Sequence, residues 1–98
     1  MTNRTPCCVL GCRCSTKHEF REWVCEKHWK RVPPRLKRNW SKIKRLIRRL
    51  VRRHPEYTEW WKLPPGSSTR LAALGLWRRH DRAWNACKAA AHEAEFGI

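Results

Sequence analysis

The fold of this chain is decided by residues 7–29, which read CCVLGCRCSTKHEFREWVCEKHW. This stretch holds five of the six cysteines and two of the five histidines in a chain of 98 residues. It contains few aliphatic side chains, and a chain of this length buries only about 60–65% of its unfolded surface. Because so small a core usually needs a staple, we expect a bound metal ion to supply most of the cohesion of residues 1–32.

Two pairs of side chains in this stretch have the spacing of metal ligands. Cys25 and His28 are three residues apart, which places them on the same side of a helical turn. Cys7 and Cys12 enclose a turn in which Gly11 relieves backbone strain. Four thiolate and imidazole ligands suit tetrahedral zinc, and the histidine favours zinc over an iron–sulfur cluster. The sequence therefore predicts zinc bound by Cys7, Cys12, Cys25 and His28.

Other assignments of these residues stay open at the level of sequence. Cys8 competes with Cys7 as the first ligand, Cys14 is a further candidate, and His18 is the best substitute ligand. Six cysteines in a short chain are also compatible with a disulfide framework. The first residues lack the apolar stretch of a secretory signal, so we expect a cytoplasmic location. Cysteine clusters in that reducing compartment are more often metal sites than disulfides.

Positive charge is concentrated in the segment that follows. Residues 27–53 hold 13 of the 23 Lys and Arg residues and no acidic residue, in a chain of net charge +15. The apolar residues of this segment recur at intervals of 4, 3, 4 and 3: Leu36, Trp40, Ile43, Ile47 and Leu50. This spacing predicts one face of a helix over residues 35–53, which starts after Pro34 and stops before Pro55.

A second helix is expected over residues 68–94. Residues 67–69 (Ser-Ser-Thr) offer N-caps, and the apolar residues that follow recur at helical spacing. Because residues 64–66 (Pro-Pro-Gly) mark a turn, the two helices should pack as an antiparallel hairpin. The expected fold is therefore small, zinc-stapled and mainly α, with a zinc-binding module at 1–32 and a basic helical hairpin at 33–98.

The residues of the predicted site resemble a known group of proteins. The pattern Cys-x4-Cys with a Val-x-Gly knuckle, Cys-x2-His-Trp, Arg-Val-Pro and an Arg-rich helix is similar to small zinc-finger proteins of bacteriophages and prophages. The matching parts are Cys7, Cys12, Cys25, His28, Trp29, Val32, Pro33 and residues 36–53. This resemblance covers about half of the chain. It implies a treble-clef-like or knuckle-like zinc module and a role in phage or mobile-element biology, and so a location in a bacterial host cell, but no particular activity.

The basic helix favours nucleic acid as the partner. Guanidinium groups pair well with phosphates, and a helix fits the major groove of DNA, so we expect DNA in preference to RNA. The predicted contact residues are Lys37, Arg38, Lys42, Arg45, Arg48, Arg49, Arg52 and Arg53. Together with the resemblance, this predicts a phage or prophage regulatory factor.

A protein partner is the alternative to nucleic acid. The same helix could bind an acidic host protein, so that a phage-encoded chain modulates a host polymerase or nuclease. Trp60 or Trp61 would then serve as an anchor, because tryptophan is enriched among residues that dominate binding energy.

Two other classes are not expected. The cysteines serve better as zinc ligands than as nucleophiles, and the paired His and Asn of an HNH-type nuclease do not occur, so we expect no enzyme. No run approaches the 18 or more apolar residues of a membrane span. A basic amphipathic helix could lie on a membrane surface, but the apolar face of this helix is expected to pack on the second helix beside a folded zinc module, so we expect no membrane partner.

Overall fold

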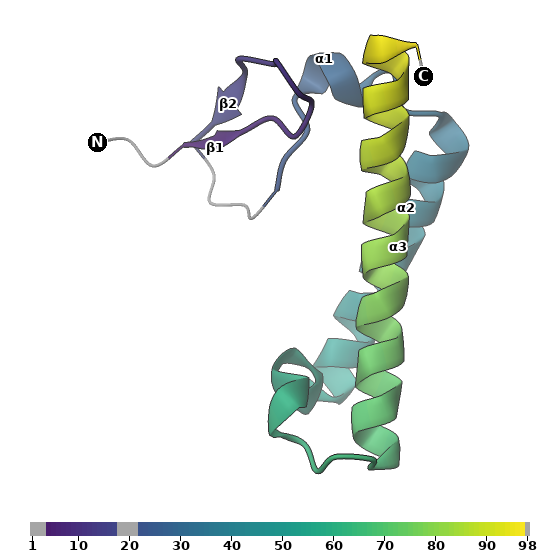
Figure 1. Cartoon of the computed structure of the whole chain (residues 1–98). Coiled ribbons are helices and arrows are strands. Elements are labelled where there is room, and N and C mark those ends of the chain that lie inside the picture. The colour runs from purple at the N-terminus through teal and green to yellow at the C-terminus, as the bar shows by residue number, and fades with distance from the viewer. Residues whose placement is uncertain (1–3, 18–21, 98) are drawn as a thin grey trace. The chain divides into compact units, whose positions relative to one another are not determined.

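The computed structural model describes residues 4–17 and 22–97. The elements in chain order are β1 (Thr5–Pro6), β2 (Ser15–Thr16), α1 (Glu26–Trp29), α2 (Pro34–Arg53), the 3-10 helix η1 (Pro55–Lys62) and α3 (Ser68–Phe96) (Figure 1). The chain forms two compact units, residues 1–37 with 85–98, and residues 38–84. The predicted fold class, mainly helical with an N-terminal Cys/His cluster, is confirmed.

The first unit begins with a short hairpin that contains a tight turn. β1 and β2 pair antiparallel, and the backbone N–H of Cys7 continues the ladder by donating to the carbonyl of Cys14 (2.9 Å). Gly11 has a φ of 82°, in the left-handed region that glycine enters without steric cost. This turn reverses the chain, so that Cys12 returns toward Cys7.

α1 is a single helical turn, and it starts directly after Cys25. The backbone N–H of Trp29 donates to the carbonyl of Cys25 (2.8 Å), and this bond closes the turn that contains His28. α2 then begins at Pro34, one residue before the expected start. Proline suits this position because its φ is already helical and the first turn of a helix leaves N–H groups unpaired.

The last part of α3 completes the first unit. Cys87 and Ala91 are fully buried, and the thiol of Cys87 donates to the carbonyl of Leu36 (3.6 Å). Lys88 forms an ion pair with Glu22. These contacts connect α3 both to the start of α2 and to the segment before α1.

Both ends of α3 are capped. The hydroxyl of Ser67 accepts a hydrogen bond from the backbone N–H of Arg70 (3.2 Å), which is the N-cap arrangement expected from residues 67–69. At the other end Gly97 has a φ of 67°, and its N–H donates to the carbonyl of Glu93 (2.8 Å). The helix therefore extends two residues beyond the expected end at 94. Within the described parts of the chain, no helix is both long and apolar enough to cross a membrane.

The second unit is a helical hairpin with its own core. Here α2 and α3 run antiparallel (Figure 1). The buried side chains of this core are Ile43, Ile47, Tyr57, Ala73, Leu76 and Ala83. Around them lie the half-buried Trp40, Leu46, Leu50, Val51, Trp60 and Trp77. The apolar face predicted for residues 35–53 is thus the face that packs in this unit.

The two helices contribute side chains of different size to this core. α2 supplies Ile43 and Ile47, whereas α3 supplies the small Ala73 and Ala83 at two of its buried positions. The connection between them is η1, which consists of two short helical turns that meet at a kink at Glu59 and which was not predicted from the sequence. The indole N–H of Trp77 donates to the carbonyl of Tyr57 (2.9 Å), so α3 holds this connection in place.

Candidate metal centre

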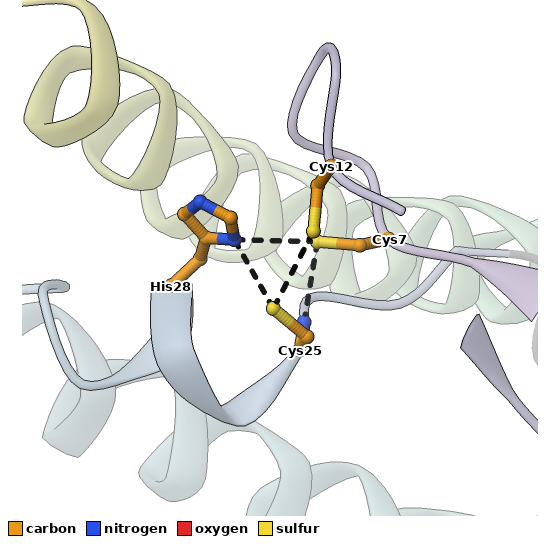
Figure 2. A group of neighbouring side chains, drawn as sticks. All are labelled: Cys7, Cys12, Cys25 and His28. Carbon is orange, nitrogen blue, oxygen red and sulfur yellow. Dashed lines mark hydrogen bonds between the residues drawn. The ribbon is translucent and has the colours of Figure 1, made fainter. Parts of the chain in front are cut away.

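Four side chains from the hairpin and α1 converge in the first unit. Cys7, Cys12, Cys25 and His28 each bring one ligand atom to a group in which all atoms lie within 4.8 Å of one another (Figure 2). The Sγ atoms of Cys12 and Cys25 are 3.8 Å apart. Nδ1 of His28 lies 3.8 Å from Sγ of Cys7 and 3.1 Å from Sγ of Cys25. These are the four residues that the spacing of the sequence predicts as ligands.

Two of these separations, both 3.8 Å, are those of a tetrahedral ion's ligands, whereas the 3.1 Å between Nδ1 of His28 and Sγ of Cys25 is shorter. Zinc–sulfur bonds of about 2.3 Å and zinc–nitrogen bonds of about 2.0–2.1 Å place the ligand atoms about 3.5–3.8 Å from one another. Three thiols and one imidazole are also the donor types that zinc prefers among common metals. The group is therefore suited to a metal ion, and its chemistry favours zinc.

Local structure accounts for the position of each ligand. Cys7 follows β1, and Cys12 follows the turn at Gly11. Cys25 directly precedes α1, so its side chain and that of His28 project from the same helical turn. The backbone N–H of Cys25 also donates to Sγ of Cys7 (3.3 Å). This contact joins the two pairs of ligands.

Burial is the main influence on the electrostatics of Cys25 in this cluster. Cys25 and His28 are each only 3% exposed. Burial raises the pKa of the Cys25 thiol to about 12, because a thiolate loses its solvation there. The pKa of Cys12 is lowered, chiefly by a hydrogen bond from the backbone of Cys14. A divalent cation would stabilise all three thiolates, since metal binding displaces the thiol protons.

The alternative ligands of the sequence analysis lie elsewhere. Cys8 is half-buried, and its thiol donates to the carboxylate of Glu22 (3.9 Å). Cys14 is exposed, and neither residue belongs to the group of four. All six cysteines are free thiols, so the disulfide framework is not formed in this structure. His18 lies outside the residues that the structure describes.

One partner of the site was not predicted from the sequence. Nε2 of His28, the ring nitrogen that faces away from the thiols, lies 3.2 Å from a carboxylate oxygen of Glu95. That residue belongs to the last turn of α3, 67 positions away. No sequence signal could have found it, because the contact depends on where α3 ends.

The predicted nucleic-acid contacts lie along α2. Seven of the eight side chains are exposed: Arg38, Lys42, Arg45, Arg48, Arg49, Arg52 and Arg53. Lys37 is half-buried, with its Nζ atom 5.8 Å from the centre of the Trp29 ring. Lys44 was not among the predicted contacts, and its Nζ atom lies 5.1 Å from the centre of the Trp40 ring. The two lysines therefore contribute packing as well as charge.

Five of the exposed cations form a single row, which we call the basic row. Its members recur at intervals of 4, 3, 4 and 3: Arg38, Lys42, Arg45, Arg49 and Arg52. The same intervals describe the apolar face, and the two sets lie on opposite sides of α2. At a rise of about 1.5 Å per residue, the basic row is about 21 Å long. Among the described residues, no ion pair involves a cation of α2.

Comparisons with protein-family models, with curated proteins and with solved structures find no match for this chain. The resemblance to phage and prophage zinc-finger proteins therefore stays a prediction. The case for a function depends on the chemistry of the Cys/His cluster and on the charge of α2.

Proposed function

We propose that this protein binds nucleic acid, DNA in preference to RNA, through the exposed cations of α2, and that a structural zinc ion stabilises its first unit. The basic row is the observation that carries the proposal.

The role assigned to the zinc is structural. Cys7, Cys12, Cys25 and His28 would fill all four positions of a tetrahedral ion, whereas a catalytic zinc keeps one position open for water. A metal held by these residues would join the N-terminal hairpin to α1, and its binding energy would become folding energy. We therefore propose a binding protein and not an enzyme.

The charge of α2 is costly for the isolated protein. Like charges three or four residues apart on a helix destabilise it by about 0.2–0.5 kcal/mol per pair, and each neighbour in the basic row is such a pair. No acidic side chain in α2 offsets this repulsion. A polyanion would relieve it, because each phosphate near an arginine replaces repulsion by attraction. The basic row therefore lowers the stability of the free helix and favours the binding of an anionic ligand.

The contacts of this surface would be mainly to phosphates. Guanidinium groups bind phosphate oxygens in two parallel hydrogen bonds, and α2 has the dimensions of a helix that enters the major groove. The uncharged polar side chains exposed on α2 are only Asn39 and Ser41. Base reading by so few side chains would be weak, so we propose binding with little sequence preference, as part of a phage or prophage regulatory role.

The test is binding measured by fluorescence anisotropy with duplex DNA, single-stranded DNA and RNA, on protein with measured zinc content. If six to eight cations contact phosphates, log K falls against log salt with a slope of about −5 to −7 between about 50 and 300 mM salt. We expect the duplex to bind most tightly. Weak binding of all three polymers at physiological salt would contradict the proposal.

A matched pair of variants locates the surface. Reversing Arg45, Arg48 and Arg49 to Glu should abolish binding. Reversing the exposed Arg78, Arg79 and Arg82 of α3 to Glu changes the net charge by the same amount and should weaken binding much less. Equal losses in the two variants would mean that total charge, and not α2, determines affinity.

One observation favours the alternative function. Trp61 of η1 is 57% exposed. Its ring lies edge-on to that of Trp60, with the two ring centres 6.1 Å apart. An exposed tryptophan held by a neighbour could anchor an acidic host protein. In that case the chain should capture one host protein from a lysate treated with nuclease, and the variant Trp61→Ala should lose it.

A further inference from the structure

The two ring nitrogens of His28 face different partners. Nδ1 points toward the thiols and lies 3.1 Å from Sγ of Cys25. Nε2 points away from them and lies 3.2 Å from a carboxylate oxygen of Glu95. A carboxylate is an acceptor only, so the hydrogen of a neutral imidazole belongs on Nε2 and the lone pair on Nδ1. The lone pair is then directed into the group of four ligand atoms.

The carboxylate of Glu95 is itself held in place. Nη1 of Arg31 donates to the same carboxylate oxygen (3.0 Å) and to the carbonyl of Ala94 (3.3 Å). That carbonyl belongs to the last turn of α3, where carbonyls lack partners within the helix and attract cations. Arg31 follows α1 in the chain, so it connects the turn after His28 to the end of α3.

We propose that Glu95 is a positioning residue of the metal centre, which orients the His28 ring and couples metal binding to the last turn of α3. This inference rests on the metal binding proposed above. Glu95 contacts the outer side of the ring, so it acts through His28 and not as a fifth ligand. Carboxylate partners of this kind fix the ring and raise the basicity of a metal-binding histidine.

Arg31 offsets part of the negative charge of this arrangement. A divalent ion with three thiolates carries a net charge of −1, and Glu95 adds another negative charge beside it. Nη1 of Arg31 contacts the same carboxylate oxygen as Nε2 of His28, and its positive charge offsets the negative charge that Glu95 adds.

Coupling between the metal and the helix end must act in both directions. If the Glu95 contact strengthens metal binding by a given factor, metal binding strengthens the contact by the same factor. Zinc should therefore protect the backbone amides of residues 88–96 from hydrogen exchange, although all four ligands lie within residues 7–28.

The experiment measures zinc affinity of the full chain by competition with a chelator. We expect E95A to bind zinc about 10–100-fold more weakly than the unmodified chain. E95Q should recover most of the affinity, because the amide oxygen of Gln accepts the same hydrogen bond. E93A removes an equal charge from the same exposed helix end and should bind as the unmodified chain does. Circular dichroism of each variant checks that α3 remains helical.

Hydrogen exchange provides the second readout. Addition of zinc should slow exchange in residues 88–96 of the unmodified chain and E93A, and fail to do so in E95A. Equal zinc affinity of E95A and E93A would overturn the role of Glu95 while leaving the metal site intact. An unmodified chain that binds no zinc would instead overturn the proposed site, and the present inference with it.

Discussion

Sγ of Cys12 lies 3.8 Å from Sγ of Cys25, although 13 residues separate the two in the chain. The distance is nearly twice the length of a disulfide bond of about 2.05 Å, but close to the edge of a zinc–thiolate tetrahedron of about 3.8 Å. The hairpin and α1 thus hold the two sulfur atoms at a separation that suits ligands of one ion.

Removal of the metal should loosen the first unit selectively. The hairpin has only two residues in each strand, so backbone pairing alone contributes little to the stability of this part of the chain. Residues 38–84 have an apolar core of their own. Excess chelator should therefore increase hydrogen exchange in residues 4–32 while exchange in the core of residues 38–84 stays slow. Equal loosening of both units would show that the second unit also depends on the metal.

Loss of one ligand should release the metal. Cys25→Ser removes a buried thiolate and should lower the zinc content measured by mass spectrometry from one ion per chain to near zero. Cys14→Ser, which changes an exposed thiol outside the cluster, should leave one ion bound. One tightly bound ion in the Cys25→Ser variant would mean that Cys8, Cys14 or His18 completes the site.

Zinc binding should weaken as the solution becomes acidic. Burial raises the pKa of Cys25 to about 12, so this thiol keeps its proton at neutral pH until a cation displaces it. Each proton released makes the apparent Kd fall about tenfold for every unit rise in pH. Competition titrations between about pH 6 and 8 should show this steep dependence. A Kd that does not change with pH would contradict thiolate ligation.

The core of the second unit should be sensitive to lost volume on α2. Ile47 is buried between the helices, and Ile47→Ala should cost about 2–5 kcal/mol of unfolding free energy, as deletions of buried isoleucine do. Val51→Ala, at a half-buried position of the same helix, should cost less. Urea unfolding followed by circular dichroism measures both. Equal, small losses would show that this core is not tightly packed.

Much of the fold could be predicted because its signals are local. The intervals in α2 and the caps of α3 depend on residues within a few turns of one another. The pair formed by Cys25 and His28 is likewise set by one helical turn. These elements can therefore be predicted without information about the rest of the chain.

The choice between Cys7 and Cys8 could not be made in the same way. Neighbouring residues in an extended segment point to opposite sides, so the pairing register of the hairpin decides which thiol faces His28. In this register Cys7 N–H pairs with the carbonyl of Cys14, and Cys7 faces the cluster while Cys8 contacts Glu22. Both residues fit the sequence pattern, and only their long-range contacts distinguish them.

Neither the partner of His28 nor the structure of residues 55–62 could be predicted from the sequence. Glu95 meets His28 because α3 continues to Phe96 and then stops at Gly97. Residues 55–62 form η1 in contact with α3, where Trp77 hydrogen-bonds to Tyr57. Each of these features depends on a contact between segments 20 or more residues apart.

The unequal side chains of the helical hairpin limit how its sequence can change. Ala73 has no exposed surface and Ala83 very little, so a larger residue at either position would have to displace the side chains packed around it. At Ile43 and Ile47 a smaller residue would leave a void. Neutral substitution is thus restricted by an upper limit on side-chain size at Ala73 and Ala83 of α3 and by a lower limit at Ile43 and Ile47 of α2. A change that moves side-chain volume from one helix to the other would need two coordinated substitutions.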